Sequence, residues 1–122
     1  MANLITNWLN NELKLSKKIN SIEDDFSNGY YFGEILSKSR IINNLKDFKN
    51  KNDIDNKLNN FRIIQKSFKE LSIKFDGNKL DDILNKKRGA ATKILYLLKM
   101  SLSKKDILFE EIINKKCKPY FN

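Results

Sequence analysis

The chain has 122 residues, enough for one domain that buries a core without disulfides or a bound metal. Its hydrophobic fraction of 40%, with 11% aromatic residues, excludes a disordered chain. The formal net charge of +9 favours partners with negative surfaces, such as nucleic acid, an anionic membrane or an acidic protein polymer.

The N-terminal third predicts two helices joined by a polar loop. A helix is expected over about 3–13, where apolar residues recur at the spacing of one helical face. These residues are Leu4, Ile5, Trp8, Leu9 and Leu13. A polar loop over 14–25 leads to a second helix, for which Ser27 or Asn28 is the expected N-cap. Within that helix Gly29 and Gly33 share a face, which predicts the close approach of another backbone.

The middle of the chain carries its clearest amphipathic pattern. A short connecting segment is expected over 41–48, with Ile41, Leu45 and Phe48 on one face. Asp53 is the expected N-cap of a long helix over about 54–72. The apolar stripe of this helix comprises Ile54, Leu58, Phe61, Ile64, Phe68 and Leu71.

The C-terminal third predicts a buried helix and a charged one. A turn over 76–78 is expected to cap a short helix bearing Leu80, Ile83 and Leu84. The next helix opens at Arg88-Gly89 and is apolar over most of its girth, which is typical of a central, buried helix. Its apolar residues are Ala90, Ala91, Ile94, Leu95, Leu97, Leu98 and Leu102. The predicted division is a domain over 1–105 and a charged helical extension over 106–122.

Little in the sequence suits catalysis, metal binding or membrane insertion. There is no histidine, and Gly29 to Gly33 lacks the Lys-Ser/Thr that follows a phosphate-binding glycine loop. The acidic runs at 23–25 and 81–82 are interpreted as charges in the first turns of helices. No segment reaches the roughly 18 apolar residues of a membrane helix. The sequence therefore predicts no enzyme activity, no cofactor and no metal.

Cys117 is the single cysteine, so no internal disulfide is possible. A reducing, intracellular compartment is therefore expected, with Cys117 as a tail residue without a role. The first residues, Met1 to Leu9, lack the charged start and apolar run of a secretory signal.

Basic residues gather in three parts of the chain. Between Asp82 and Asp106 no acidic residue occurs. The basic residues of that interval are Lys86, Lys87, Arg88, Lys93, Lys99, Lys104 and Lys105. The other two groups are Lys46, Lys49, Lys51 and Lys57, and Lys14, Lys17 and Lys18. On a continuous helix Lys93 and Lys104 share a face, because eleven residues make about three turns.

Two interpretations of these basic groups stay open. Lysine outnumbers arginine 21 to 3 and asparagine is abundant, which suggests a mutational bias in the genome. Many of the lysines are then expected to lie on solvated helix faces without a binding role. The functional interpretation is an electrostatic footprint for an acidic polymer. The scarcity of arginine, which nucleic-acid sites use for bidentate and stacking contacts, argues against nucleic acid.

Five sequence blocks form an ordered set. They are WLNNEL at 8–13, FSNGYYFGEIL at 26–36, KLNNF at 57–61, FDGN at 75–78 and RGAATKILY at 88–96. Together they resemble the calponin-homology (CH-like) domain of the sperm flagellar protein 2 family. The resemblance implies an all-α, calponin-homology-like bundle with four main helices and short connecting helices. Most of the matching residues are expected to be core or capping residues, namely Trp8, Gly29, Leu58, Asn59, Phe61 and Ala91. Asn59 and Asn60 are expected to bond to neighbouring backbone.

The resemblance also implies a function in the cytoskeleton. It places the domain at the N-terminus of a long protein of the ciliary or flagellar axoneme, in the central-pair apparatus and so in the cytoplasm. Related single domains associate with microtubules, whereas actin binding is better known for tandem pairs. The predicted function is therefore a non-catalytic microtubule-binding module, monomeric in isolation. The residues expected to contact tubulin are Lys86, Lys87, Arg88, Lys93, Lys104, Lys105, Lys46, Lys49 and Lys51. The alternative is an adaptor that docks axonemal or intraflagellar-transport proteins through an apolar groove, with the charge incidental.

Overall fold

Helices make up all the regular structure of the described chain. The computed structural model describes residues 2–121, with side chains described for residues 3–105. The elements are α1 (Ala2–Asn7), the π-helical η1 (Trp8–Glu12), α2 (Ile22–Asp25), α3 (Tyr30–Lys38), α4 (Ile54–Glu70), α5 (Gly77–Leu84) and α6 (Ala90–Phe121). No strand occurs within residues 2–121, which confirms the predicted all-α fold.

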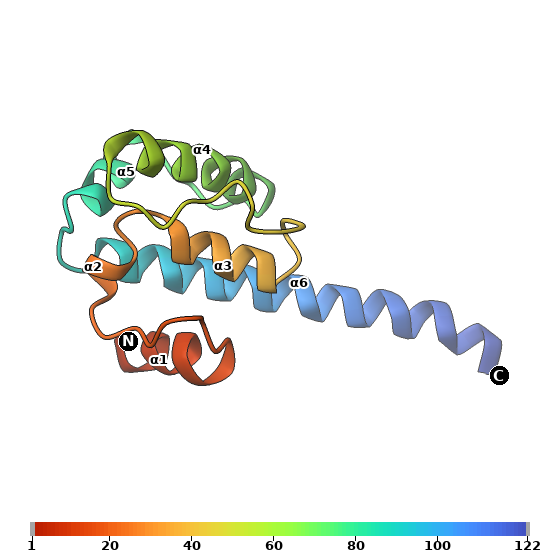
Figure 1. Ribbon diagram of the computed structural model, residues 1–122. Helices are drawn as coiled ribbons and strands as arrows, with labels where there is room; N and C mark the ends of the chain where they lie inside the picture. Colours follow the sequence, from red (N-terminus) through yellow and green to blue (C-terminus); the bar gives the residue numbers. More distant parts are fainter. Residues whose placement is uncertain (1, 122) are drawn as a thin grey trace.

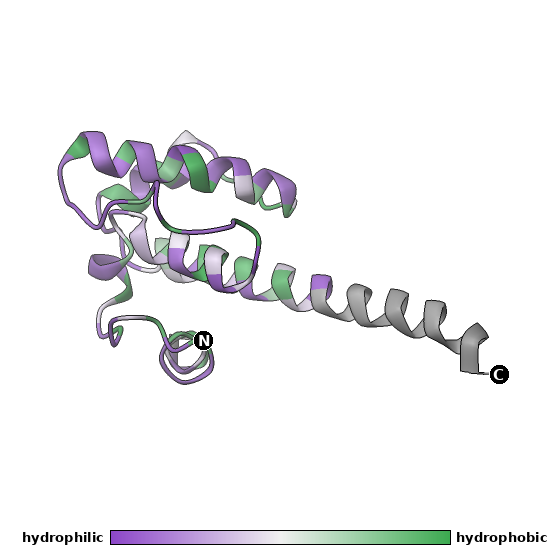
Figure 2. Ribbon diagram, turned by 45° about the vertical axis from the view of Figure 1, so that its right-hand side comes forward, coloured by the Kyte–Doolittle hydropathy of each residue, from purple (hydrophilic) through white to green (hydrophobic). Residues whose placement is uncertain are grey.

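The arrangement has four main helical stretches and two short connecting helices. α1 continues directly into η1, and α3, α4 and α6 are the other main stretches. α6 contacts α1, α2 and α5, while α3 contacts α4. Figure 1 shows α4 and α5 on one side of α6 and α1 on the other. Hydrophobic and hydrophilic residues alternate along α4 and the first turns of α6 in Figure 2, as expected for helices with one buried face.

Aromatic rings form the centre of the core. The ring centroid of Phe32 lies 4.9 Å from that of Phe26, 6.2 Å from that of Phe61 and 6.0 Å from that of Phe68. All three pairs meet edge to face, the arrangement that aromatic quadrupoles favour. α6 covers this cluster with a buried face of Ala91, Ile94, Leu95, Leu98 and Leu102. The predicted burial of the helix that begins after Gly89 is confirmed for these residues.

Two apolar residues of the predicted α4 stripe lie outside the core. Ile54 is 58% exposed and Leu58 is 41% exposed, so the prediction that they are core residues is wrong. Periodicity places them on the same face as the buried Phe61 and Ile64, but the part of this face at the start of the helix is exposed. The helix also ends at Glu70, before the predicted 72, because Ser72 adopts a left-handed conformation with φ +61°.

The connection between α3 and α4 is not helical. Its predicted apolar residue Phe48 is buried, while Ile41 and Leu45 are half-buried against the core. A Cβ atom at Gly33 would lie 2.6 Å from the Phe48 ring, so only glycine leaves room for this side chain. At Gly29 the nearest atoms belong to Asn60 and Ile64, both of α4. The glycine pair therefore does permit close packing, but what approaches Gly33 is a phenyl ring and not a second backbone.

Helix starts follow the predicted capping chemistry at two of three sites. Asp53 accepts the side-chain amide of Asn56 at 2.7 Å and its backbone amide proton at 3.2 Å, and these bonds lower the pKa of Asp53 below its ordinary value. Asp76 caps α5 in the same way. At α3 the prediction of a Ser27 or Asn28 cap is wrong, because Gly29 occupies the N-cap with φ +85°. In the loop predicted over 14–25, Ser21 caps the additional short helix α2.

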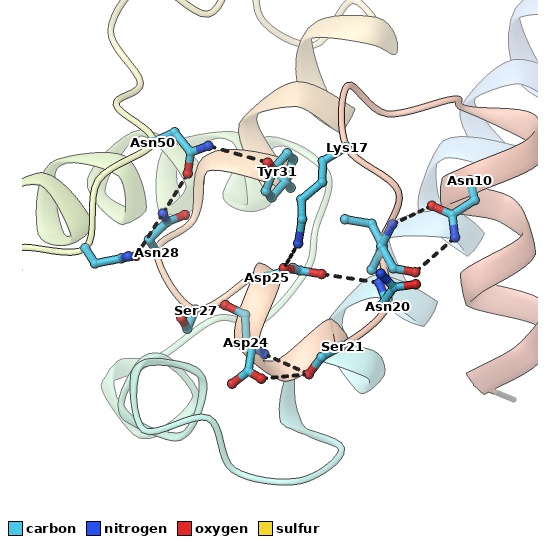
Figure 3. A network of polar contacts seen from close by, with 12 residues as sticks. Asn10, Lys17, Asn20, Ser21, Asp24, Asp25, Ser27, Asn28, Tyr31 and Asn50 are labelled. Atoms are coloured by element: carbon cyan, nitrogen blue, oxygen red, sulfur yellow. Dashed lines mark hydrogen bonds and ion pairs between the residues drawn. The ribbon is translucent and has the colours of Figure 1, made fainter.

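Side chains of the N-terminal half fix the loop that precedes α2. The Asn10 amide donates to the Ile19 carbonyl at 3.0 Å and accepts the Ile19 amide proton at 2.8 Å (Figure 3). The buried carboxylate of Glu34 accepts two bonds from Ser16, one from its backbone and one from its hydroxyl. This loop is therefore held to η1 and to α3 by polar contacts at both ends.

Asn60 is a fully buried amide at the centre of the second polar cluster. It donates to the carbonyl of Asn28 at 2.9 Å and to that of Lys49 at 2.8 Å, and it accepts the Lys49 amide proton at 3.0 Å. Its neighbour Asn59 donates to the Asp47 carbonyl at 3.0 Å. The expectation that both asparagines bond to backbone is confirmed. They tie α4 to the connection that runs before it.

The neighbouring asparagines extend this cluster around the start of α3. Asn28 donates to the side chains of Asn50 at 2.9 Å and Asn52 at 3.2 Å, and it accepts the Tyr30 amide proton at 2.9 Å. Asn50 in turn contacts the Tyr31 hydroxyl at 3.4 Å (Figure 3). Side chains of the FSNGYYFGEIL and KLNNF motifs therefore fix the backbone path of residues 49–52.

α6 is one continuous helix from Ala90 to Phe121, and it extends past the other helices in Figure 1. Its backbone has no break at residue 105, so the predicted division into 1–105 and 106–122 stays a prediction. Cys117 and the apolar residues predicted beyond 105 lie outside the described side chains. Within the described chain no helix combines the length and apolarity that crossing a bilayer requires.

Replacing Asn60 should destabilise the domain strongly. Asn60→Ala leaves the carbonyls of Asn28 and Lys49 and one amide proton without their buried partner, so the free energy of unfolding should fall by about 1–3 kcal/mol or more. Urea denaturation followed by circular dichroism measures this. The exposed Gln65→Ala on the same helix is the control and should change stability by less than about 0.5 kcal/mol. Equal effects of the two substitutions would contradict the assigned role.

Gly33→Ala should also destabilise, by about 1–3 kcal/mol, because the added methyl group overlaps the buried Phe48 ring. Gly77→Ala is the matched control, since no atom lies within 4 Å of a Cβ built there. Thermal unfolding of both variants compares them directly. A Gly33→Ala protein as stable as the control would show that Phe48 does not occupy this site.

Candidate binding surface

The turn between α5 and α6 presents the first predicted basic group, and two of its members have acidic neighbours. Lys86 Nζ lies 3.5 Å from Asp24 Oδ1, and Lys87 Nζ lies 3.8 Å from Asp82 Oδ2. The expectation of charge without counter-charge is therefore wrong at these two positions, because Asp24 of α2 lies beside Lys86 and Asp82 of α5 lies beside Lys87. Such solvent-exposed ion pairs contribute only about 0–1 kcal/mol to the free energy of unfolding. No carboxylate among residues 3–105 lies within 4.0 Å of Arg88.

The start of α6 is held by an acidic residue of α2. Glu23 accepts the amide proton of Gly89 at 3.1 Å, across 66 residues of sequence. A carboxylate at a helix N-terminus is favourable because free N–H groups and the helix dipole meet it there. The acidic run at 23–25 lies in the first turn of α2, a helix within the predicted loop, and its Glu23 also positions α6. The run at 81–82 lies beyond the first turn of α5, so its interpretation as first-turn charge is wrong.

Lys93 and Lys104 lie on the same exposed face of α6, as the helical repeat predicts. Between them on the same face lie Leu97 and Met100, which are 37% and 44% exposed. Sequence reasoning counted Leu97 among the buried residues, which is wrong, and gave Met100 no place in the site. Lys105, next to Lys104, is also exposed. We call Lys93, Leu97, Met100 and Lys104 the α6 stripe.

Lys99 points elsewhere. Its ammonium lies 5.9 Å from the centroid of the Trp8 ring, within the range of a cation–π contact. It therefore joins α6 to η1 and stands apart from the α6 stripe. Lys17 is likewise engaged, because it forms an ion pair with Asp25, and that hydrogen bond raises the pKa of Lys17 (Figure 3).

The second predicted basic group lies on the connection between α3 and α4. Lys46, Lys49 and Lys51 are exposed there. The Asn60 side chain forms two hydrogen bonds with the backbone of Lys49, so buried contacts fix the position of the backbone that carries this group. This connection is anchored to α3 and α4, whereas the α6 stripe belongs to another helix. The nine predicted residues therefore form three separate groups: the α5–α6 turn, the exposed face of α6 and the α3–α4 connection.

No metal site is found among the described side chains. Within that part of the chain no group of three or more acidic or thiol side chains is placed to hold a metal ion. Several of the acidic residues have structural partners, namely Glu23, Glu34, Asp53 and Asp76.

The chain was compared with protein families and known proteins. Residues 5–100 match the family model described as "CH-like domain in sperm protein". Sperm flagellar protein 2 of Rattus norvegicus is 39% identical over 107 residues, and that of Homo sapiens is 36% identical over the same length. Each alignment covers 86% of this chain and 6% of the relative, so the chain spans a small part of those proteins. No solved structure matched. Since the family model covers most of the chain and its helices, the chain belongs to the family of CH-like domains in sperm protein.

Proposed function

We propose that this domain is a non-catalytic cytoskeletal module of a flagellar protein and that it binds microtubules through its basic surface. The relatives' name, sperm flagellar protein 2, supports a place in the flagellum, and the predicted location in the axonemal central pair is part of the proposal. The nine basic residues named from the sequence are the proposed contacts with tubulin.

One observation carries this proposal: among residues 3–105 basic residues outnumber acidic residues by 21 to 12, and most lysines face solvent without a carboxylate partner. Residues 106–122 hold three lysines and three acidic residues, so the whole net charge of +9 belongs to residues 1–105. Among residues 3–105 only Lys17, Lys86 and Lys87 have a carboxylate within 4.0 Å. A surface with this imbalance attracts an acidic polymer and should bind it less tightly as salt rises.

The adaptor function is the second candidate, and a groove between α4 and α5 favours it. The groove has a volume of about 300 Å³, and the exposed Leu58 lies at its edge. Its apolar wall is formed by Leu58, Phe61, Phe75 and Leu80. In this case partner binding would depend on apolar contacts, and reversing the charge of exposed lysines would leave it intact.

Co-sedimentation with taxol-stabilised microtubules, at low and at moderate salt, tests the proposed function. Binding should be clear at low salt and weaker at moderate salt. The triple reversal Lys93→Glu, Lys104→Glu, Lys105→Glu should weaken it by about tenfold or more, equivalent to about 1.4 kcal/mol. Actin filaments, pelleted in parallel, should bind the domain less.

A matched control separates a specific surface from general charge. Lys66→Glu, Lys69→Glu and Lys74→Glu change the net charge equally at other exposed positions and should weaken binding much less. Equal losses in both triple variants would show that the attraction is not localised. No co-sedimentation at either salt would exclude direct microtubule binding and leave the adaptor function.

A further inference from the structure

The α6 stripe combines charge with exposed apolar surface. Its members stand at spacings of four, three and four residues, so they fall within an arc of about 60° on the helix. Leu97 and Met100 form the middle, and a lysine lies at each end. Among the described residues five large hydrophobic side chains are at least 37% exposed, and Leu97 and Met100 are two of these five. The pair is therefore an uncovered contact surface and not an isolated exposed residue.

A hollow between α5 and α6 adjoins the stripe at its Lys93 end. Its volume is about 200 Å³, and its lining residues are Lys79, Asp82, Ala90, Lys93, Ile94 and Leu97. The side chains of Ala90, Ile94 and Leu97 give it an apolar wall, and Lys79 and Lys93 also line it. The ammonium of Lys79 donates to the Lys74 carbonyl at 3.0 Å. This α5–α6 hollow has room for an apolar side chain of a partner.

The charges around the hollow select an acidic partner. Neither Lys79 nor Lys93 has a carboxylate within 4.0 Å among residues 3–105. Asp82 also lines the hollow, but its carboxylate lies 3.8 Å from Lys87. Lys104 supplies a further ammonium at the far end, about 16 Å along the helix from Lys93 at a rise of about 1.5 Å per residue. Carboxylates of the partner are thus favoured at both ends of the apolar pair.

We propose that the domain meets the microtubule through the α6 stripe and the α5–α6 hollow, and that these bind an acidic helix exposed on tubulin. About three turns of a helix match the 16 Å length of the stripe. On the tubulin helix, the face that contacts the stripe carries carboxylates toward its two ends and two apolar side chains between them. One of these apolar side chains enters the α5–α6 hollow. This inference rests on the proposed function and adds that binding includes an apolar contact, which salt does not screen.

The decisive variant removes the apolar pair and keeps every charge. Leu97→Ser with Met100→Ser should weaken co-sedimentation with taxol-stabilised microtubules by about tenfold at both salt concentrations, because buried apolar area is lost. The steepness of the salt dependence should stay that of the unsubstituted domain. Lys93→Glu with Lys104→Glu should also weaken binding, but it should flatten the salt dependence, since ionic contacts are lost.

Exposed apolar residues on other helices supply the control. Leu4→Ser with Ile54→Ser removes two similarly exposed side chains, one of α1 and one of α4, and should change binding by less than about twofold. Thermal unfolding shows whether each variant folds. If Leu97→Ser perturbs the wall of the hollow, the single variant Met100→Gln tests the apolar contact instead, because Met100 is not part of that wall.

The outcomes separate this inference from the function on which it rests. If the unsubstituted domain does not bind microtubules, the proposed function itself fails. If it binds and the Leu97, Met100 variant binds equally well, microtubule binding stands and the apolar contact is wrong. Loss of binding in the Leu4, Ile54 control would show that the loss is not specific to the α6 stripe and would contradict the inference.

Discussion

The buried amide of Asn60 is the contact on which the arrangement of this domain depends most. It satisfies the carbonyls of Asn28 and Lys49 and accepts the amide proton of Lys49, so three segments meet at one side chain. An amide without partners in this position would cost about 1–3 kcal/mol for each unsatisfied group. Within the α3–α4 connection the Phe48 amide donates to the Leu45 carbonyl at 2.9 Å. The connection is also held by the bonds of Asn60 and by the Phe48 ring on Gly33.

Structural and functional roles fall to different residue types in this chain. Asparagine, glycine and phenylalanine of the family motifs build the frame, and carboxylates such as Glu23 and Asp53 cap helices. Lysines are largely left on the surface, and they give the domain its net charge. The family resemblance therefore rests on residues that specify the fold, while the proposed contacts rest on residues that are free to vary without unfolding it.

The sequence predicted the helices well where a helix buries one continuous face, as Phe61 to Phe68 and Ile94 to Leu102 show. It failed where the outcome depends on which element covers a face. Leu97 and Ile54 fit an apolar pattern, but they are 37% and 58% exposed. Residues 41–48 have helical spacing, yet Phe48 lies against Gly33 without a helix. The acidic partners of Lys86 and Gly89 come from α2, more than 60 residues earlier, which no local pattern reveals.

Amide hydrogen exchange of Lys49, followed by nuclear magnetic resonance, tests the central role of Asn60 most directly. The Lys49 N–H lies in an exposed connection without secondary structure, but it donates to the buried Asn60 side chain. It should therefore exchange as slowly as amides in the middle of α4, and far more slowly than that of Lys51, for which no acceptor lies among the described residues. Exchange of Lys49 as fast as that of Lys51 would show that Asn60 does not hold the connection and would contradict this packing.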